Sequence, residues 1–591
     1  MKISRRALVR GTMAATSGVK GLALSANNQR SDVRSGEHFY TQLLDANERT
    51  VQRVLQELAS GQTHWPNIRR VGAYMEALTA ALCASESTRH NSGELIGPME
   101  KISDILVSAQ HSDGTIDAGN LHSPPDTGFV VQTVCRALAV LRTANDARLE
   151  RVQENLKKFV LDAGEPLITG GIHTPNHRWV VASALAQVNA LFPQPKYVER
   201  IDDWLDEGIY IDADGQYSER STGIYSRVID EALITMARLL KRPRLLNPVR
   251  RNLEMNVYYT HPDGEIETLG SRRQDQNMTE FISNYYLEYR FMALNDANPL
   301  FAAVTRFIEA SQLQRVMQTN PLISFLEEPR LRGELPPGGE LPARYERLFA
   351  STGMARIRRD SVSASVYGGS DWPLGVASGL ASNPTFFTFR KGASILEALR
   401  LGTNFFSEGA FRSTGLAKSG NSYALQQRFE VPYYQPLPKD KRKPRGDYKL
   451  TPVKDSRFWS KMDFPDRRMS NIQVLEQKIS VREIAGKFEL EFDVTGPARV
   501  PITLEIALRP GGKLDGTLTE KTKDRIYLLR EGTCKYSVGE DTIEFGPGEA
   551  AHEYLNLAGS SYIAHGATLR PNGLCVYITG FTPFQRKLTV G

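Results

Sequence analysis

The helical character of this chain is clearest at Trp179-Val-Val-Ala-Ser-Ala-Leu-Ala-Gln-Val-Asn-Ala-Leu191, where apolar residues recur every three or four positions. That spacing puts them on one face of an α-helix. The same period, broken by short turns, predicts helices at residues 43–58, 71–82, 99–109, 129–141, 152–161, 179–191, 198–207, 225–239 and 282–292. Helices of this length, joined by short loops without intervening strands, favour stacked hairpins and predict an incomplete α/α toroid.

The period changes to two after a connection rich in Pro and Gly. Alternating or β-branched and aromatic segments follow at residues 361–367, 385–390, 488–494, 502–508 and 575–579. Such turn-separated segments predict a large antiparallel β-sandwich. We therefore expect a toroid domain at residues 35–326, a linker at 327–343 and a β-sandwich domain at 344–591, because a chain of 591 residues is too long for one core.

The composition narrows the possible partners. A net charge of +6 on 591 residues is mild and fits an acidic small molecule or polymer, and no nucleic-acid signature is present. The four cysteines lie far apart, without the Cys/His spacing of a structural zinc site. We expect no metal and no cofactor.

The first residues are typical of a targeting segment. Arg5-Arg6 precedes a weakly apolar run at residues 11–24 that ends in small residues. The run resembles a twin-arginine export signal and is too short and too polar to span a bilayer. We therefore predict that residues 1–26 direct export and that the mature protein works in the periplasm or outside the cell. The alternative is a disordered N-terminus with a chance arginine pair.

Four kinds of functional group gather before two of the expected helices. Asn176 and His177 precede the helix predicted at Trp179, where Asn176 fits an N-cap, and Arg220 precedes the helix predicted at Tyr225. Together they suit removal of a weakly acidic proton beside a carboxylate. That reaction needs donors to neutralise the carboxylate, a base at the proton and an acid at the leaving oxygen.

The division of these roles is open. Asn176 donates to the carboxylate with His177 or Arg220, and Tyr225, whose deprotonation a neighbouring Arg220 favours, acts as base and then returns the proton. Alternatively His177 takes the proton and Tyr225 only donates. In both versions the chemistry is that of uronic acids, and the expected reaction is β-elimination in an acidic polysaccharide.

These residues also form a pattern that points to a family. Asn176-His177 before an aromatic residue, followed about fifty residues later by Asp214-Gly-x-Tyr217 and then Tyr225, resembles the polysaccharide lyases with an α/α toroid and C-terminal antiparallel sheets. Those proteins include alginate lyases, chondroitin and hyaluronan lyases, and heparinase II/III-like proteins. The resemblance implies that Asn176 and His177 neutralise the carboxylate, with His177 a possible base, that Arg220 is a charge partner, and that Tyr225 is base or acid.

Further residues are candidates for binding the sugar. They are His122, Asp126, Trp179, Tyr217, Glu219, Arg273, Asn277, Tyr367 and Trp372. An alternative for Asp126 is capping of the next helix, and an alternative for the segment with Arg273 and Asn277 is a solvated loop. Heparinase II/III-like proteins often carry a His-rich turn where this chain reads Tyr367-Gly-Gly-Ser-Asp-Trp372. This difference argues against a metal and against a second catalytic histidine from the sheet domain.

Two rival functions remain. A glycoside hydrolase on a similar helical barrel needs two carboxylates beside the bond, and Asp202, Asp203, Asp214 and Glu219 supply carboxylates nearby. A non-catalytic glycan-binding protein needs neither base nor acid.

A basic insert, Lys439-Asp-Lys-Arg-Lys-Pro-Arg445, follows Tyr433 and Tyr434. It suits steering of a polyanion, although a charge run is more often a solvated loop.

Overall fold

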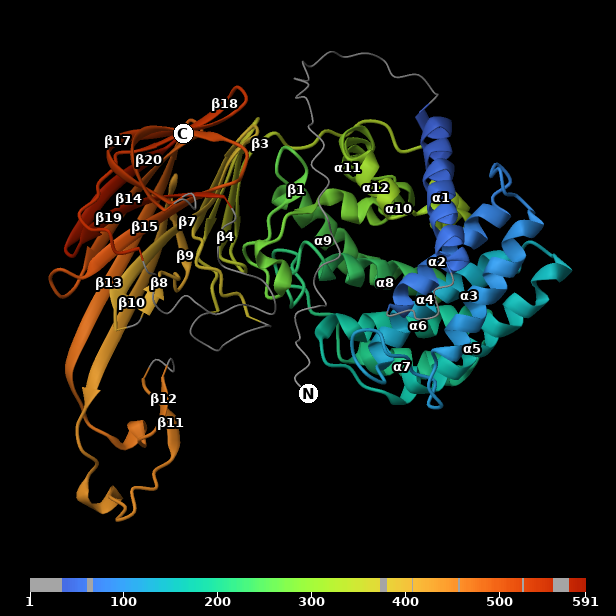
Figure 1. The fold of residues 1–591 in the computed structure, drawn as a ribbon, viewed down its shortest axis with the longest axis horizontal. Helices are drawn as coiled ribbons and strands as arrows, with labels where there is room; N and C mark the ends of the chain where they lie inside the picture. Colours follow the sequence, from blue (N-terminus) through green and yellow to red (C-terminus); the bar gives the residue numbers. More distant parts are fainter. Residues whose placement is uncertain are drawn as a thin grey trace.

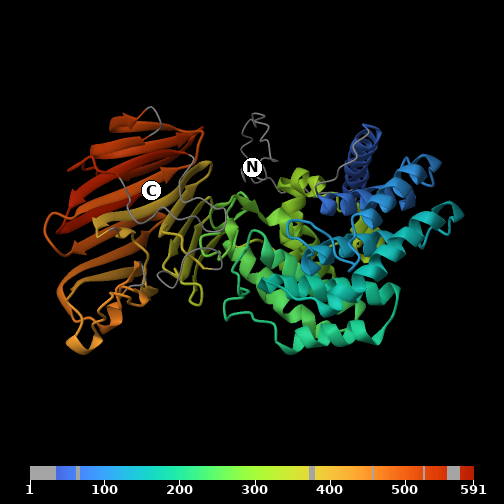
Figure 2. The same cartoon turned by 60° about the horizontal axis from the view of Figure 1, so that its bottom comes forward.

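The computed structural model describes residues 35–60, 67–371, 380–406, 408–454, 458–522, 526–555 and 573–591. These residues form a helical domain and a sheet domain that lie side by side (Figures 1 and 2). The predicted export segment, residues 1–26, and Trp372 lie outside the described residues. The described helices include none that is long and apolar enough to cross a bilayer.

The helical domain is a toroid of hairpins, as predicted. Helices α2, α4, α6 and α8 pack against one another in succession, while α3, α5 and α7 lie against them as an outer row. The helices are α1 (Ser35–Ala59), α2 (Ile68–Cys83), α3 (Ile96–Ser108), α4 (Pro124–Leu141), α5 (Glu150–Thr169), α6 (Pro175–Leu191), α7 (Pro195–Asp206), α8 (Tyr225–Leu239), α9 (Leu246–Tyr259), α10 (Tyr286–Asp296), α11 (Pro299–Ser311), α12 (Leu313–Gln318) and α13 (Leu322–Glu327).

Two inner helices begin earlier than their apolar pattern predicted. Helix α4 starts at Pro124 and α6 at Pro175, in both cases with proline at the first helical position, where its missing N–H is not needed. The prediction that Asn176 is an N-cap is therefore wrong. Thr174 holds that position, and Asn176 and His177 lie inside the first turn of α6.

The second domain is built on one sheet of 16 strands that folds over on itself. Its main order is β3-β4-β5-β6-β7-β15-β19-β17-β18-β20-β14-β13-β10-β9, and neighbours are antiparallel except β17 and β19. Although β6 and β14 are far apart in this order, the rings of Phe387 and Phe488 lie 5.2 Å apart. Two layers therefore enclose an apolar core, and the predicted antiparallel sandwich is confirmed apart from the parallel pair β17–β19.

The strands of this sheet and of two small pairs have the following bounds. They are β1 (Glu265–Ile266), β2 (Glu280–Phe281), β3 (Arg344–Phe349), β4 (Met354–Arg359), β5 (Val362–Tyr367), β6 (Phe387–Lys391), β7 (Ser394–Phe405), β8 (Glu408–Ala410), β9 (Leu416–Ser419), β10 (Ser422–Tyr434), β11 (Leu450–Pro452), β12 (Trp459–Lys461), β13 (Met469–Ile484), β14 (Lys487–Thr495), β15 (Pro501–Leu508), β16 (Lys513–Thr522), β17 (Ile526–Val538), β18 (Asp541–Gly546), β19 (Leu574–Phe581) and β20 (Phe584–Val590).

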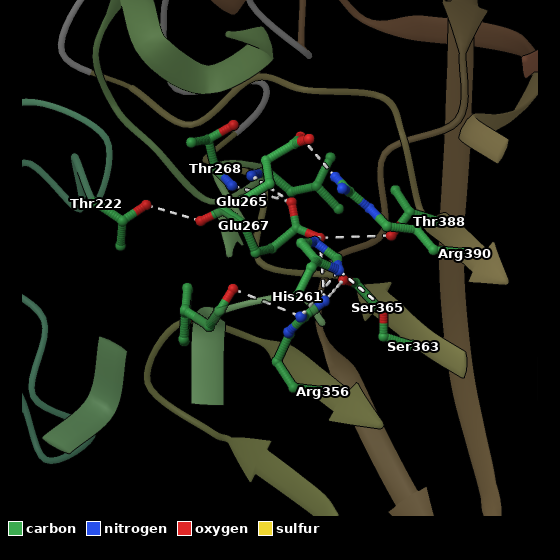
Figure 3. Close-up of polar contacts among 12 residues, drawn as sticks. Thr222, His261, Glu265, Glu267, Thr268, Arg356, Ser363, Ser365, Thr388 and Arg390 are labelled. Atoms are coloured by element: carbon green, nitrogen blue, oxygen red, sulfur yellow. Dashed lines mark hydrogen bonds and ion pairs between the residues drawn. The ribbon is translucent and has the colours of Figure 1, made fainter. Parts of the chain in front are cut away.

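A buried polar network joins the two domains (Figure 3). Glu267, from the toroid, lies 3.3 Å from the guanidinium of Arg356 on β4, a side chain with no solvent exposure. Glu265 on β1 pairs at 2.6 Å with Arg390 on β6. Separating such a pair would leave a buried charge without its partner, which is strongly unfavourable. These pairs therefore hold the toroid in one position against the sheet.

Candidate active site

A buried carboxylate connects the two segments that the sequence singled out. The side-chain Nδ2 of Asn176 donates to both oxygens of Glu219, at 3.1 and 2.9 Å, and the backbone N–H of Asn176 donates to Oε2 at 3.0 Å. Glu219 also forms an ion pair with Arg273. A negative charge is favourable here, because the N-terminus of α6 carries partial positive charge.

Tyr225 is the first residue of α8 and lies beside this cluster. Its backbone N–H donates to the hydroxyl of Ser221 at 3.1 Å, which fixes the start of the helix. Its own hydroxyl accepts from Nε2 of Gln274 at 2.7 Å, and the guanidinium of Arg273 lies 4.2 Å from its ring centroid. The ring is half-buried. The chain of contacts from Asn176 through Glu219 and Arg273 to Tyr225 thus brings the two helix starts together.

His177 supplies a neutral imidazole to the same region. Its ring stands edge-on to that of His173, with centroids 4.7 Å apart, and edge-on to Phe129 at 6.3 Å. Burial, and then the proximity of His173, lower its pKa to about 4. The imidazole is therefore uncharged near neutral pH, and its Nδ1 forms no hydrogen bond within the described residues.

The loop before Tyr225 is held from several sides. Gly223 donates its backbone N–H to the carboxylate of Asp275 at 3.0 Å, and a Cβ at Gly223 would approach the side chain of Glu280 to 2.6 Å. The hydroxyl of Thr222 donates at 2.7 Å to the backbone carbonyl of Glu267, the residue whose carboxylate meets Arg356 across the domain interface (Figure 3). The interface network therefore fixes the approach to Tyr225 as well.

The chain is similar to known proteins in structure but not in sequence. No family model and no curated sequence matches the chain. Among solved structures, the Streptomyces coelicolor A3 chondroitin AC lyase in complex with chondroitin sulphate superposes with a TM-score of 0.55 at 13% identity, over 95% of this chain and 80% of that one. The chain has a polysaccharide-lyase fold. Heparinase III gives 0.52 at 12% identity, over 88% of this chain and 75% of its own.

Arg220, which was expected to activate the phenol of Tyr225, binds the sheet domain through its guanidinium. Its guanidinium donates to the backbone carbonyl of Ser351 at 2.7 Å, in the turn between β3 and β4, and its backbone has a left-handed φ of 49°. Asp214 accepts from the backbone N–H of the same Ser351 at 2.6 Å. These two residues therefore contact the sheet domain, and Arg273 is the cation that lies against Tyr225.

Three residues proposed to contact the sugar are buried instead. Trp179 and Tyr217 lie in the toroid core, and the hydroxyl of Tyr217 donates to Asp230 at 2.7 Å. Tyr367 is buried at the domain interface. Each ring contributes apolar area to packing, which corrects its assignment to binding. Glu219 is buried too and acts through Asn176 and Arg273. The side chain of Asn277 lies outside the described part of the chain.

The two candidates near the start of α4, Asp126 and His122, differ in their surroundings. Asp126 is in the first turn of α4, where its backbone N–H donates to Ser123, the N-cap, and its carboxylate pairs with Arg69. The alternative that Asp126 caps this helix is therefore also wrong, because Ser123 is the cap and the buried carboxylate of Asp126 accepts from the hydroxyl of Ser123. His122 is exposed and its ring stacks on His111 at 3.9 Å.

Sequence reasoning missed Arg69 and Gln274. Arg69 lies in the first turn of α2 with its guanidinium 4.1 Å from the Phe129 ring, and its charge and that of Asp126 act on His177. Arg69 carries no local signal, because it enters the site through a contact with a segment distant in sequence, whereas Gln274 lies within the polar segment at residues 271–277 that the sequence indicated. Within the described residues no group of three or more His, Cys, Asp or Glu side chains is arranged to hold a metal ion.

Proposed function

We propose that this protein is a lyase that cleaves a uronic-acid-containing polysaccharide by β-elimination. The observation that carries the proposal is the half-buried Tyr225, with a hydroxyl held by Gln274, a guanidinium from Arg273 against its ring, and His177 nearby on the adjoining helix. The lyase fold of the whole chain supports the same reaction class.

The carboxylate of the sugar acid must be neutralised before the neighbouring proton becomes acidic enough to remove. We assign this task to Arg273 and to the N–H of neutral His177, because the amide of Asn176 already donates to Glu219. Asn176 acts as a positioning residue that orients Arg273 through that carboxylate. Fixed donors of this kind stabilise the enolate-like intermediate without reorganising during the reaction.

Tyr225 then performs both proton transfers. As phenolate, it takes the proton alpha to the carboxylate; the resulting carbanion forms the carbon–carbon double bond as the bond to the glycosidic oxygen breaks. The phenol returns the proton to that oxygen. Tyr225 is the first residue of α8, and the guanidinium of Arg273 lies against its ring. In the alternative version His177 takes the proton and Tyr225 protonates the leaving oxygen.

The carboxylates considered for a hydrolase are dispersed. Asp202 pairs with Arg242 and Asp203 is exposed on the outer helix α7, whereas Asp214 binds the turn at Ser351. Glu219 is buried in its own ion pair. A pair of carboxylates flanking one glycosidic bond is therefore not formed by these four residues.

Purified protein incubated with alginate, glucuronan and glycosaminoglycans tests the proposal. A lyase produces an unsaturated uronate, so ultraviolet absorbance rises as reducing ends appear. A hydrolase produces reducing ends without that absorbance, and a binding protein produces neither. Reducing ends without the absorbance on every polymer would replace the lyase by the hydrolase.

A further inference from the structure

The sheet domain carries a projecting segment that the catalytic proposal does not use. Between β10 and β13 the chain leaves the sandwich, forms the small β11–β12 pair and returns. We call residues 433–454 and 458–469 the basic arm. It extends from the far end of the sandwich, away from the toroid, in both views (Figures 1 and 2).

The basic arm holds the net charge of the whole protein. It contains ten of the 73 Lys and Arg residues and four of the 67 Asp and Glu residues, a net charge of +6, so the remaining sequence is balanced at 63 of each. Within the described residues, seven of the ten basic side chains form no ion pair, namely Lys439, Arg442, Lys443, Arg445, Lys449, Arg467 and Arg468. A positive field is therefore concentrated at one place, open to solvent.

The arm also has an internal structure that fixes its surface. Phe464 is buried between Tyr434 and Phe458, with ring centroids 4.8 and 6.3 Å away. Arg467 donates to the backbone carbonyls of Met462 at 2.6 Å and of Gln435 at 3.2 Å, and so joins the two ends of the arm. These contacts hold the two ends of the segment together.

Large apolar side chains are exposed on the same arm. Tyr433, Leu450, Phe458 and Trp459 each keep between 55% and 60% of their surface accessible. Partly exposed aromatic rings beside cations are suited to stacking on sugar rings whose acidic groups meet the Lys and Arg side chains. A second copy of the chain is a poor occupant, since it presents the same positive arm and the rest of its sequence carries no net charge.

We propose that the basic arm is a second, non-catalytic binding site for the acidic polysaccharide, which retains the polymer while its other end reaches the active site. This inference rests on the proposed function for its choice of ligand. It implies that long chains engage both sites, whereas a tetrasaccharide engages only the active site. A polymer that occupies both sites of one protein molecule is then bound more tightly than a tetrasaccharide that occupies one.

The test uses the full chain with the inactive Tyr225→Phe substitution, so that alginate and chondroitin sulfate stay intact. The arm variant combines Lys441→Ala, Lys443→Ala and Arg445→Ala, and Trp459→Ala is a separate variant. The matched control removes three other lysines, each more than half exposed, from the same domain: Lys478→Ala, Lys535→Ala and Lys587→Ala. Calorimetric titration measures the Kd of polymer and of tetrasaccharide at low and high salt.

We expect the arm variant to raise the Kd of the polymer about tenfold at low salt, with a smaller difference at high salt, because screening weakens exposed charge contacts. The control stays within about twofold, and the tetrasaccharide is bound equally by all. In the active protein the arm variant raises KM for polymer at unchanged kcat. Trp459→Ala raises the polymer Kd without changing its salt dependence.

Equal losses in the arm and control variants would overturn the proposal. So would a wild-type dimer in light scattering that the arm substitutions dissociate, or binding to phosphatidylserine vesicles in place of polymer. Failure of the proposed function is distinguishable from these results. In that case no polymer yields an unsaturated product, while arm-dependent binding is still measured.

Discussion

The molecule contains two buried clusters of the same chemistry with different surroundings. At the domain interface Glu267 meets Arg356, and His261 completes a network whose three members are all buried (Figure 3). At the helix starts Glu219 meets Arg273, and the guanidinium lies against the half-buried ring of Tyr225.

The difference shows that a buried ion pair does not by itself mark an active site. Burial and the nearby charge of Arg356 lower the pKa of His261 to about 3, and burial lowers that of His177 to about 4. His261 shares a hydrogen bond of 2.9 Å with Ser363 through Nδ1, and within the described residues each histidine keeps one ring nitrogen without a hydrogen bond, Nε2 in His261 and Nδ1 in His177. What distinguishes the cluster proposed to be reactive is therefore the half-buried phenol of Tyr225 against its guanidinium, which the interface cluster lacks.

The largest effect is expected from Tyr225→Phe, which removes only the hydroxyl that Gln274 contacts. Loss of a group that transfers protons lowers kcat/KM roughly 10²- to 10⁴-fold. Ultraviolet assay of the variant measures the loss, and its unfolding free energy stays close to that of the parent. Turnover at the parent rate would show that the phenol is structural, and His177 would then be the remaining base.

Arg356→Met tests the buried cluster at the domain interface. The substitution keeps much of the side-chain length and leaves the carboxylate of Glu267 buried without its guanidinium. Removing one partner of a buried pair lowers the free energy of unfolding by roughly 3–5 kcal/mol, measured by denaturant titration. Arg358→Met, on the same strand but with its guanidinium at the surface, is the control and changes that free energy by at most about 1 kcal/mol. Equal stability of the two variants would contradict a structural role for the network.

The sequence was sufficient for the architecture because hydrophobic periods of 3.6 and 2 are local properties. It was insufficient where contacts are distant. The pairing of Glu219 with Asn176 and Arg273 joins segments about fifty residues apart on each side, and no period specifies it. Tyr217 and Trp179 were misassigned because an aromatic residue in a polar motif looks the same whether its ring faces a cleft or the core.

Helix starts were misplaced for a related reason. The apolar period of α6 begins at Trp179, but Pro175 starts the helix one turn earlier. That turn contains Asn176 and His177. Because their side chains are polar, the apolar period predicted a loop where the chain is helical. The sequence indicated Asn176, His177 and Tyr225 as candidates, and only the folded structure shows what surrounds them.

We expect the free energy of unfolding to fall with pH at the domain interface, where Glu265 is paired. Burial alone would raise the pKa of Glu265, but the charges and hydrogen bonds of Arg390 and Arg509 outweigh it and lower the pKa from 4.5 to about 2. A depressed carboxylate contributes stability above its unfolded pKa and loses it as pH falls toward the folded one, a loss of roughly 3 kcal/mol between those values. Denaturant titrations across this range measure it, and Glu265→Gln reduces the slope with pH. An unchanged slope would show that other groups dominate acid unfolding.

The smallest effect on turnover and stability is expected from substitutions of Arg220, which lies in the loop between Glu219 and Tyr225 and binds the sheet domain at Ser351. Its guanidinium donates to the carbonyl of Ser351, so Arg220→Ala lowers the free energy of unfolding by about 1 kcal/mol and leaves kcat/KM within about threefold. Arg220→Gly removes the same guanidinium but relaxes the left-handed φ of 49°, and is more stable than Arg220→Ala by about 1 kcal/mol. If both variants instead lose turnover as completely as Tyr225→Phe, Arg220 takes part in the chemistry. The distinction between a reactive cluster at Tyr225 and structural contacts at Ser351 then fails, because a residue bound to the sheet domain would be acting on the sugar.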